Sequence, residues 1–145
     1  MNMNITLRVK VTTLFLMGWL LASGQEGKLL HQSFSLDSIQ ELTVEPGWEY
    51  VIEPWAGSSI LVETHVSIEN ASRAVMDHFL ETGRYNLETN REGEKLQLLA
   101  VDKERRPIQT KKGSCYEAVR MKIFLPDQFE RVGDNLWQRR SPGTE

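Results

Sequence analysis

The stretch from Ile60 to Ile68 constrains the fold most strongly, because apolar and polar side chains alternate along nearly all of it. One face would carry Ile60, Val62, Thr64, Val66 and Ile68, and the other Glu63, His65, Ser67 and Glu69. Successive side chains of a β-strand point to opposite faces of the sheet, so a period of two indicates a strand that is buried on one side. Such a strand is typical of an antiparallel sheet with one face on the core and one in water.

Similar patterns, separated by turn residues such as Pro46-Gly47, predict further strands along the chain. These strands are expected at 28–36, 39–44, 48–53, 84–89, 95–101 and 114–125, with a charged loop at 102–113. The fold class is therefore mainly β, with antiparallel strands and one short helix. This class leaves open that the strands are the start of a β-helix or β-roll.

The one helix is expected at 71–82. Apolar residues recur there at intervals of three and four, which places them on one stripe of an amphipathic helix. Asn70 is a suitable N-cap, and Gly83 stands where a helix commonly stops.

The first 24 residues have the three parts of a secretory signal. Arg8 and Lys10 give a positive start, an apolar run covers 11–21, and the small residues Ala22, Ser23 and Gly24 precede a cut before Gln25. Signal peptidase would recognise Ala22 and Gly24. The alternative is a retained membrane anchor, although the apolar run is shorter than the roughly 20 residues that span a bilayer. The expected organisation is a signal at 1–24, a β-rich domain at 25–126 and a loosely ordered polar tail at 127–145.

Export has consequences for charge and redox chemistry. Loss of the signal removes two basic residues and no acidic one, which changes the formal net charge from −3 to −5. A net acidic domain is a poor nucleic-acid binder, and no such partner is expected. The single cysteine, Cys115, cannot form an intrachain disulfide, so we expect a buried thiol. The mature chain would be periplasmic, attached to the cell surface or secreted, and would meet a membrane only if the signal segment is retained.

No motif predicts catalysis. The spacings of zinc peptidases, serine hydrolases and phosphate-binding loops do not occur, so no catalytic, metal-binding or cofactor-binding residues are predicted. The alternative is an envelope hydrolase that uses acidic and histidine residues. That hypothesis requires His65 or His78 to lie within hydrogen-bond reach of a Glu or Asp side chain.

Two tryptophans, Trp48 and Trp55, are the candidate binding aromatics. Exposed rings would offer large apolar area to an envelope protein or a surface glycan. The alternative is that Trp48 and its neighbour Tyr50 fill the core of a small β-domain.

The order of strands resembles the start of bacterial head-GIN domains, which are auto-transporter adhesin-like domains of unknown function. The segments that carry the resemblance are Leu42-Thr43-Val44, Tyr50-Val51-Ile52, Ile60-Leu61-Val62-Glu63-Thr64, Lys95-Leu96-Gln97-Leu98 and Met121-Lys122-Ile123-Phe124-Leu125-Pro126. The resemblance covers roughly residues 34 to 126. It implies an exported, non-enzymatic β-protein of the cell surface or periplasm.

The chain departs from that family after Pro126. Family members continue into short repeated strands that stack, whereas residues 127–145 are polar and show no such repeat. This difference predicts a short variant or a chain whose end is truncated or frame-shifted. The leading expectation is an exported, non-enzymatic structural or interaction module of the cell envelope. A hydrolase and a fragment without independent function are the alternatives.

Overall fold

The structure is a computed structural model that describes residues 27–141 and 143. The predicted signal, with Ala22 and Gly24, lies outside the described residues. Eleven strands and one helix follow in chain order: β1 Lys28–Ser35, β2 Glu41–Glu45, β3 Glu49–Trp55, β4 Ser59–Glu69, α1 Arg73–Glu81, β5 Leu87–Glu92, β6 Lys95–Ala100, β7 Gln109–Thr110, β8 Gly113–Ser114, β9 Tyr116–Pro126, β10 Phe129–Arg131 and β11 Leu136–Arg139. The predicted mainly β class with one short helix is confirmed.

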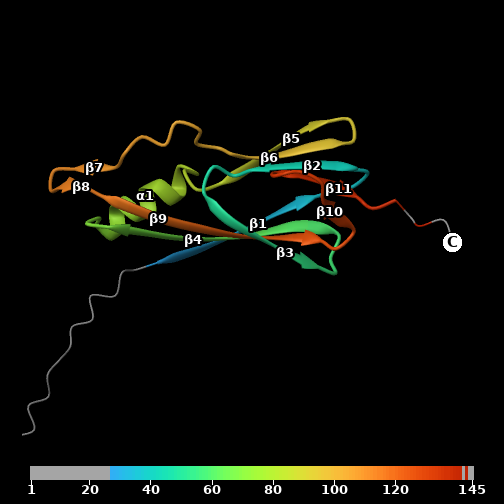
Figure 1. The fold of residues 1–145 in the computed structure, drawn as a ribbon. Coiled ribbons are helices and arrows are strands. Elements are labelled where there is room, and N and C mark those ends of the chain that lie inside the picture. Colours follow the sequence, from blue (N-terminus) through green and yellow to red (C-terminus); the bar gives the residue numbers. More distant parts are fainter. Residues whose placement is uncertain (1–26, 142, 144–145) are drawn as a thin grey trace, which may run out of the picture.

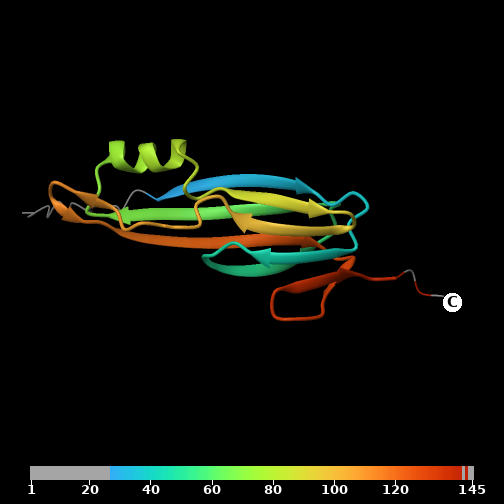
Figure 2. The same ribbon diagram turned by 90° about the horizontal axis from the view of Figure 1, so that it is seen from above.

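The strands form two layers that face each other (Figures 1 and 2). One layer, here called sheet A, has the strand order β1-β4-β9-β3. The other layer, sheet B, has the order β10-β11-β2-β6-β5. A small hairpin, β7-β8, extends from one end. The architecture is therefore a β-sandwich.

The core lies between the two layers, as the alternation predicts. On β4, the predicted inward residues are all buried, including the polar Thr64, whose exposed fraction is 1%. β9 buries Val119, Met121, Ile123 and Leu125 on the same side. Sheet B faces them with Leu42, Val44, Leu96, Leu98 and Ala100. Each layer thus hides one apolar face and leaves the other in water.

One side of the sandwich is joined by a side-chain amide. The Nε2 of Gln32 on β1 donates to the carbonyl of Leu87 on β5 at 3.0 Å, and the N–H of Leu87 donates to Gln32 Oε1 at 2.8 Å. Both strands are edge strands, one from each sheet. The amide therefore links the two layers where their edges meet.

The helix α1 packs its apolar stripe against the core, where Met76 is buried and Phe79 and Leu80 are half-buried. Its N-cap is Ser72, whose hydroxyl accepts the N–H of Val75 at 3.4 Å, and not the predicted Asn70. Asn70 instead adopts a φ of 60° in the turn after β4. In the part of the chain that the structure describes, no helix has the length and apolar character needed to cross a membrane.

The pairing directions are more varied than the sequence predicts. Most neighbouring strands are antiparallel, but β2 and β6 run parallel, as do β3 and β9. Alternation along a strand shows which face is buried but contains no information about the direction of a neighbour. A parallel pair requires a long crossover connection, and both pairs meet this requirement because many residues separate their strands in sequence.

The segment after Pro126 also differs from the predicted loosely ordered tail. Residues of β10 and β11 form an antiparallel hairpin, and β11 pairs with β2 at the edge of sheet B. Phe129 is buried and Trp137 is half-buried against the core. Strands of three and four residues are too short to give a recognisable period in the sequence, which is why the hairpin escapes prediction.

Candidate functional site

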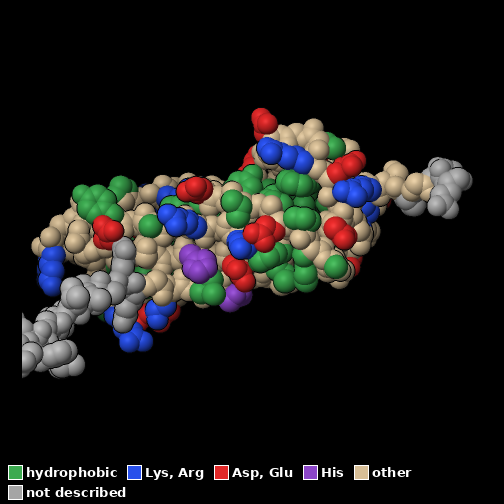
Figure 3. Space-filling view, turned by 60° about the horizontal axis from the view of Figure 1, so that its bottom comes forward, with side chains coloured by type: hydrophobic (Ala, Val, Ile, Leu, Met, Phe, Trp, Pro, Cys, Tyr) green, Lys and Arg blue, Asp and Glu red, His purple; other side chains and the backbone are tan. Residues whose placement is uncertain are grey.

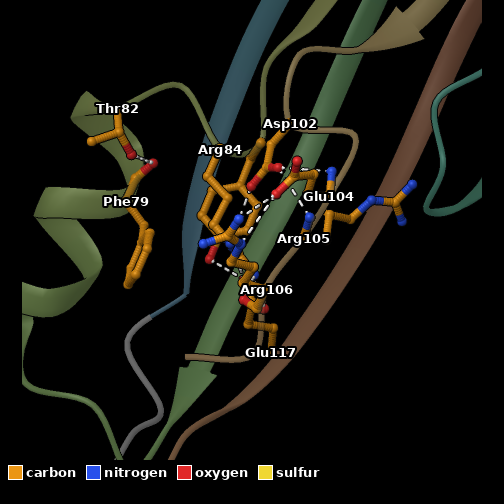
Figure 4. A network of polar contacts seen from close by, with 9 residues as sticks. Phe79, Thr82, Arg84, Asp102, Glu104, Arg105, Arg106 and Glu117 are labelled. Carbon is orange, nitrogen blue, oxygen red and sulfur yellow. Dashed lines mark hydrogen bonds and ion pairs between the residues drawn. The ribbon is translucent and has the colours of Figure 1, made fainter. Parts of the chain in front are cut away.

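The strongest polar cluster in the described chain surrounds Arg84, just after α1 (Figure 4). The Arg84 side chain is only 6% exposed. It forms a bidentate pair with Glu117 at the inward-facing start of β9, with Nε to Oε1 at 2.7 Å and Nη2 to Oε2 at 2.8 Å. It also donates to Asp102 Oδ2 at 3.1 Å and to the carbonyl of Arg106 at 2.7 Å. One arginine thus connects the end of the helix, β9 and the loop after β6.

The ionisation states in this cluster follow from burial and pairing. Burial raises the pKa of Glu117, but hydrogen bonds from Arg84 and from the Tyr85 hydroxyl outweigh it, and the pKa lies below its usual value. The Tyr85 hydroxyl donates to Glu117 Oε1 at 2.6 Å. Burial and this hydrogen bond raise the pKa of Tyr85. The hydrogen bond to Glu117 raises the pKa of Arg84 as well.

These shifts favour a structural role for the cluster. Glu117 stays ionised and accepts hydrogen bonds at both oxygens, so it holds no proton to donate at neutral pH. Asp102 is held as well, because the backbone N–H of Arg105 donates to its Oδ1 at 3.0 Å and lowers its pKa. The Arg84 guanidinium also lies 5.1 Å from the centre of the Phe79 ring. The cluster borders an open surface pocket of about 510 Å³, whose lining includes Phe79, Arg84 and Asp102. The charged groups of Arg84, Asp102 and Glu117 are nevertheless paired with one another.

The sequence contained one overlooked signal for this cluster. Glu117, Val119 and Met121 are alternate residues of β9, so their side chains point to the same face of the sheet. The alternation therefore places the Glu117 carboxylate on the buried face. A charged side chain at such a position requires a buried partner. Nothing in the sequence pattern identifies that partner as Arg84.

The outer face of sheet A is a second candidate, because it combines charged pairs with exposed apolar side chains. Lys122 Nζ lies 3.1 Å from Glu53 Oε1, and His31 Nε2 lies 3.7 Å from Glu63 Oε1. Beside them lie Val51, Leu61 and Phe124, which we call the sheet A patch. Phe124 is directly opposite Leu61, and Val51 is opposite Lys122, two residues before Phe124 on β9. Figure 3 shows hydrophobic side chains gathered between charged groups on this face.

The outer face of sheet B has a different character. The outward residues of β2, β5, β6 and β10 are mainly acidic or amide: Glu41, Thr43, Glu45, Glu88, Asn90, Glu92, Lys95, Gln97, Leu99 and Glu130. Its charged groups are partly paired, since Lys95 lies 3.0 Å from Glu41 and Lys103 lies 3.7 Å from Glu88. The two broad faces of the sandwich therefore offer a partner very different surfaces.

Neither candidate tryptophan side chain projects freely into solvent. Trp48 is half-buried and packs against the core, with its ring 6.2 Å from that of Tyr85. The guanidinium of Arg105 covers the ring at 4.6 Å. Trp55 donates from Nε1 to the carbonyl of Ser59 at 3.0 Å. Its ring lies over Gly57, where an added Cβ would be 2.0 Å from a ring atom. Both rings support local structure.

The two histidines that the hydrolase hypothesis names, His65 and His78, lie on different elements, β4 and α1. His65 is exposed on the outer face of sheet A, opposite Arg120 on β9 and Leu29 on β1. His78 is exposed on α1, with its ring against Phe79 at 5.1 Å. Within residues 27–141 and 143, no three His, Cys, Asp or Glu side chains are grouped to hold a metal ion. Cys115 is buried, as predicted, and its Sγ lies 3.4 Å from the carbonyl of Asn70.

Comparisons with known proteins give no relative. No family model, no curated protein and no solved structure matches this chain.

Proposed function

We propose that this chain is an exported, non-enzymatic, adhesin-like interaction module of the bacterial cell envelope. In this proposal a protein partner binds the outer face of sheet A, centred on the sheet A patch. The secretory signal predicted at 1–24 supports export. We choose the outer face of sheet A because it carries apolar side chains, whereas the outer face of sheet B is mainly acidic or amide.

The sheet A patch has the features of a contact surface. Val51 is 55% exposed and lies diagonal to Phe124 on the neighbouring strand. Leu61 is directly opposite Phe124 on the other side of β9. An outer sheet face is expected to be polar, so these apolar side chains are unusual there. Contiguous apolar side chains ringed by polar groups are typical of protein interaction sites. Lys122 lies 5.8 Å from the Phe124 ring and pairs with Glu53, so charged groups border the patch on one side. These charges would orient a partner, while burial of the apolar side chains would supply affinity.

The patch lies on a regularly paired part of sheet A. β4 and β9 pair over nine residues, from Leu61 opposite Phe124 to Glu69 opposite Tyr116. Their inner side chains are almost fully buried. A surface on paired central strands changes little on binding, which reduces the entropy lost. This arrangement suits a module that presents a fixed surface.

The test is retention of the labelled exported chain on isolated envelope fractions. Val51→Glu adds a charge at the most exposed residue of the patch, on its β3 side, without disturbing the core. We expect retention to fall about tenfold, which is typical for the loss of a significant interface side chain. Val132→Glu is the matched control, because Val132 is also an exposed valine (48%) but lies in the turn between β10 and β11.

Equal retention of the wild-type chain and of Val51→Glu would overturn the choice of this face. Equal loss in Val51→Glu and Val132→Glu would overturn it too, because the effect would then reflect added negative charge rather than position. Urea unfolding of both variants establishes that each one is folded.

A further inference from the structure

We propose that β1 pairs with β1 of a second copy of this chain, in antiparallel orientation, and so joins two sandwiches through one continuous sheet. This inference is independent of the proposed function, because it uses the edge of sheet A and not its outer face. In the described chain, sheets A and B together have four edge strands, which are β1, β3, β10 and β5.

The strand β1 is a long, regular edge. It pairs with β4 residue by residue, from Lys28 opposite Val66 to Ser35 opposite Ser59, without a bulge. Within the described residues, no strand pairs with its other side. It contains no proline and no acidic residue, and its outward Leu29 is 46% exposed. An edge of this kind presents free backbone N–H and C=O groups to another chain.

The other three edges are protected by the means that natural proteins use. β3 carries Glu49, Glu53 and Pro54, and proline cannot donate to a ladder. β10 has only three residues. β5 is mainly charged or polar, and its backbone at Leu87 is already bonded by the Gln32 amide. Of these four edges, β1 is the least protected, because its one permanently charged residue is Lys28 at the first position.

Charge favours a second copy as the occupant. Lys28 is the one permanently charged residue of β1, and it lies at the strand's first position. Antiparallel pairing sends the two Lys28 side chains to opposite ends, so like charges do not meet. The acidic side chains on sheet B lie on the outer face of the other layer. A neutral edge thus meets a neutral edge, although the mature chain is net acidic.

A two-fold axis beside Ser33 is compatible with antiparallel pairing of the two β1 strands. With the axis perpendicular to the sheet, the outer faces of the two copies stay on the same side. Ser33 then lies opposite Ser33 of the other copy, His31 opposite Ser35, and Gln32 opposite Phe34. The small Ser33 side chains avoid a clash at the axis. This register uses the second half of β1, away from α1, which lies toward the strand's start (Figures 1 and 2).

The first test is sedimentation velocity of the exported chain, with its N-terminus established by mass spectrometry, over concentrations up to the millimolar range. We expect a monomer–dimer equilibrium. Ser33→Lys places two like charges side by side at the axis and should raise the dimer dissociation constant about fivefold or more. Thr89→Lys is the matched control, because Thr89 is an exposed residue of the edge strand β5, and it should leave the constant unchanged.

A second test traps the register. With diamide as oxidant, Ser33→Cys should form an intermolecular disulfide, since directly opposite residues of antiparallel strands have Cα atoms within the range that a disulfide spans. The native Cys115 is buried and does not compete. Thr89→Cys should remain largely monomeric.

A chain that stays monomeric at all concentrations would overturn the proposal. So would a dimer that Ser33→Lys leaves intact, because association would then use another surface. Unchanged urea unfolding midpoints in the lysine variants ensure that any loss of dimer reflects the edge and not the fold.

Discussion

The side-chain amide of Gln32 forms two hydrogen bonds with the backbone of Leu87, one to its carbonyl and one from its N–H. The amide thereby substitutes for the backbone of a neighbouring strand at the edge of β5. The two residues are 55 positions apart in sequence. This contact joins β1 of sheet A to β5 of sheet B and closes one side of the sandwich.

Gln32→Leu tests the contribution of that link. The substitution keeps the size of the side chain but leaves the N–H and C=O of Leu87 without their partner. We expect the free energy of unfolding to fall by about 1–3 kcal/mol, which is typical of unsatisfied buried backbone groups. Urea denaturation measures the change. Gln97→Leu serves as control, because Gln97 is exposed on the outer face of β6 and should change stability by about 0.5 kcal/mol or less. Equal losses in both variants would contradict the role of the amide.

Replacing only one partner of the buried pair of Arg84 and Glu117 should lower the free energy of unfolding strongly. Arg84→Met leaves an ionised carboxylate in a site that is largely hidden from water, and we expect a loss of about 3–5 kcal/mol in the free energy of unfolding. The double variant Arg84→Met, Glu117→Met should lose less than Arg84→Met alone, because it removes the stranded charge. Chemical denaturation of the three proteins checks this order.

Arg73→Met is the control for this experiment. Arg73 is exposed on α1 and lies 3.8 Å from Asp77, so its pair contributes about 0.5 kcal/mol or less. If the double variant is less stable than Arg84→Met, the interpretation of Glu117 as an uncompensated charge is wrong.

Stability should depend on pH through Glu117. Its pKa is lower in the folded chain than in the unfolded chain, since hydrogen bonds from Arg84 and Tyr85 outweigh burial. The stabilisation is therefore complete above the unfolded pKa of about 4.3 and is lost as the pH falls through the folded pKa. We expect the free energy of unfolding to decline below about pH 4.3, and Glu117→Gln to show a shallower decline. Urea titrations between pH 3 and pH 7 measure both slopes.

The Arg84→Met variant supplies the internal control for this pH dependence. Without the guanidinium, burial opposes ionisation of Glu117 more strongly, so the acid decline should be weaker than in the wild-type chain. Identical acid slopes in the wild-type chain and in Glu117→Gln would show that other carboxylates produce the decline.

The C-terminal hairpin should depend on Arg139. Its guanidinium donates to the carbonyls of Ile39 at 2.9 Å and Leu36 at 3.1 Å and lies 4.8 Å from the centre of the Phe129 ring. Arg139→Ala removes these contacts, and we expect a loss of about 1.5–3 kcal/mol in the free energy of unfolding. We also expect faster amide hydrogen exchange in β10 and β11.

Arg140→Ala is the neighbouring control, because Arg140 is exposed and its guanidinium lies 3.7 Å from Glu130. It should leave stability within about 0.5 kcal/mol of the wild-type value. Hydrogen exchange in β10 and β11 that is equal in both variants would show that Arg139 does not hold the hairpin.

Local patterns in the sequence determined the class of fold and much of its detail. The alternation in β4 and β9 showed which side chains are buried, because a strand's period of two is a local property of its backbone. The stripe at 71–82 placed the helix correctly, although Ser72 and not Asn70 caps it. The buried thiol of Cys115 also followed from the sequence.

The tertiary structure decided what local patterns cannot contain. It determined that β2 pairs parallel with β6, that β10 and β11 extend sheet B, and that Trp48 and Trp55 are engaged by Arg105 and Ser59. It brought Arg84 to Glu117, which is 33 positions away, and Gln32 to Leu87. The alternation along a strand indicates which of its faces is buried. Which strands pair with it depends on the packing of the whole chain. For this reason only the folded chain showed that Gln32 bonds to Leu87 and that Glu117 pairs with Arg84.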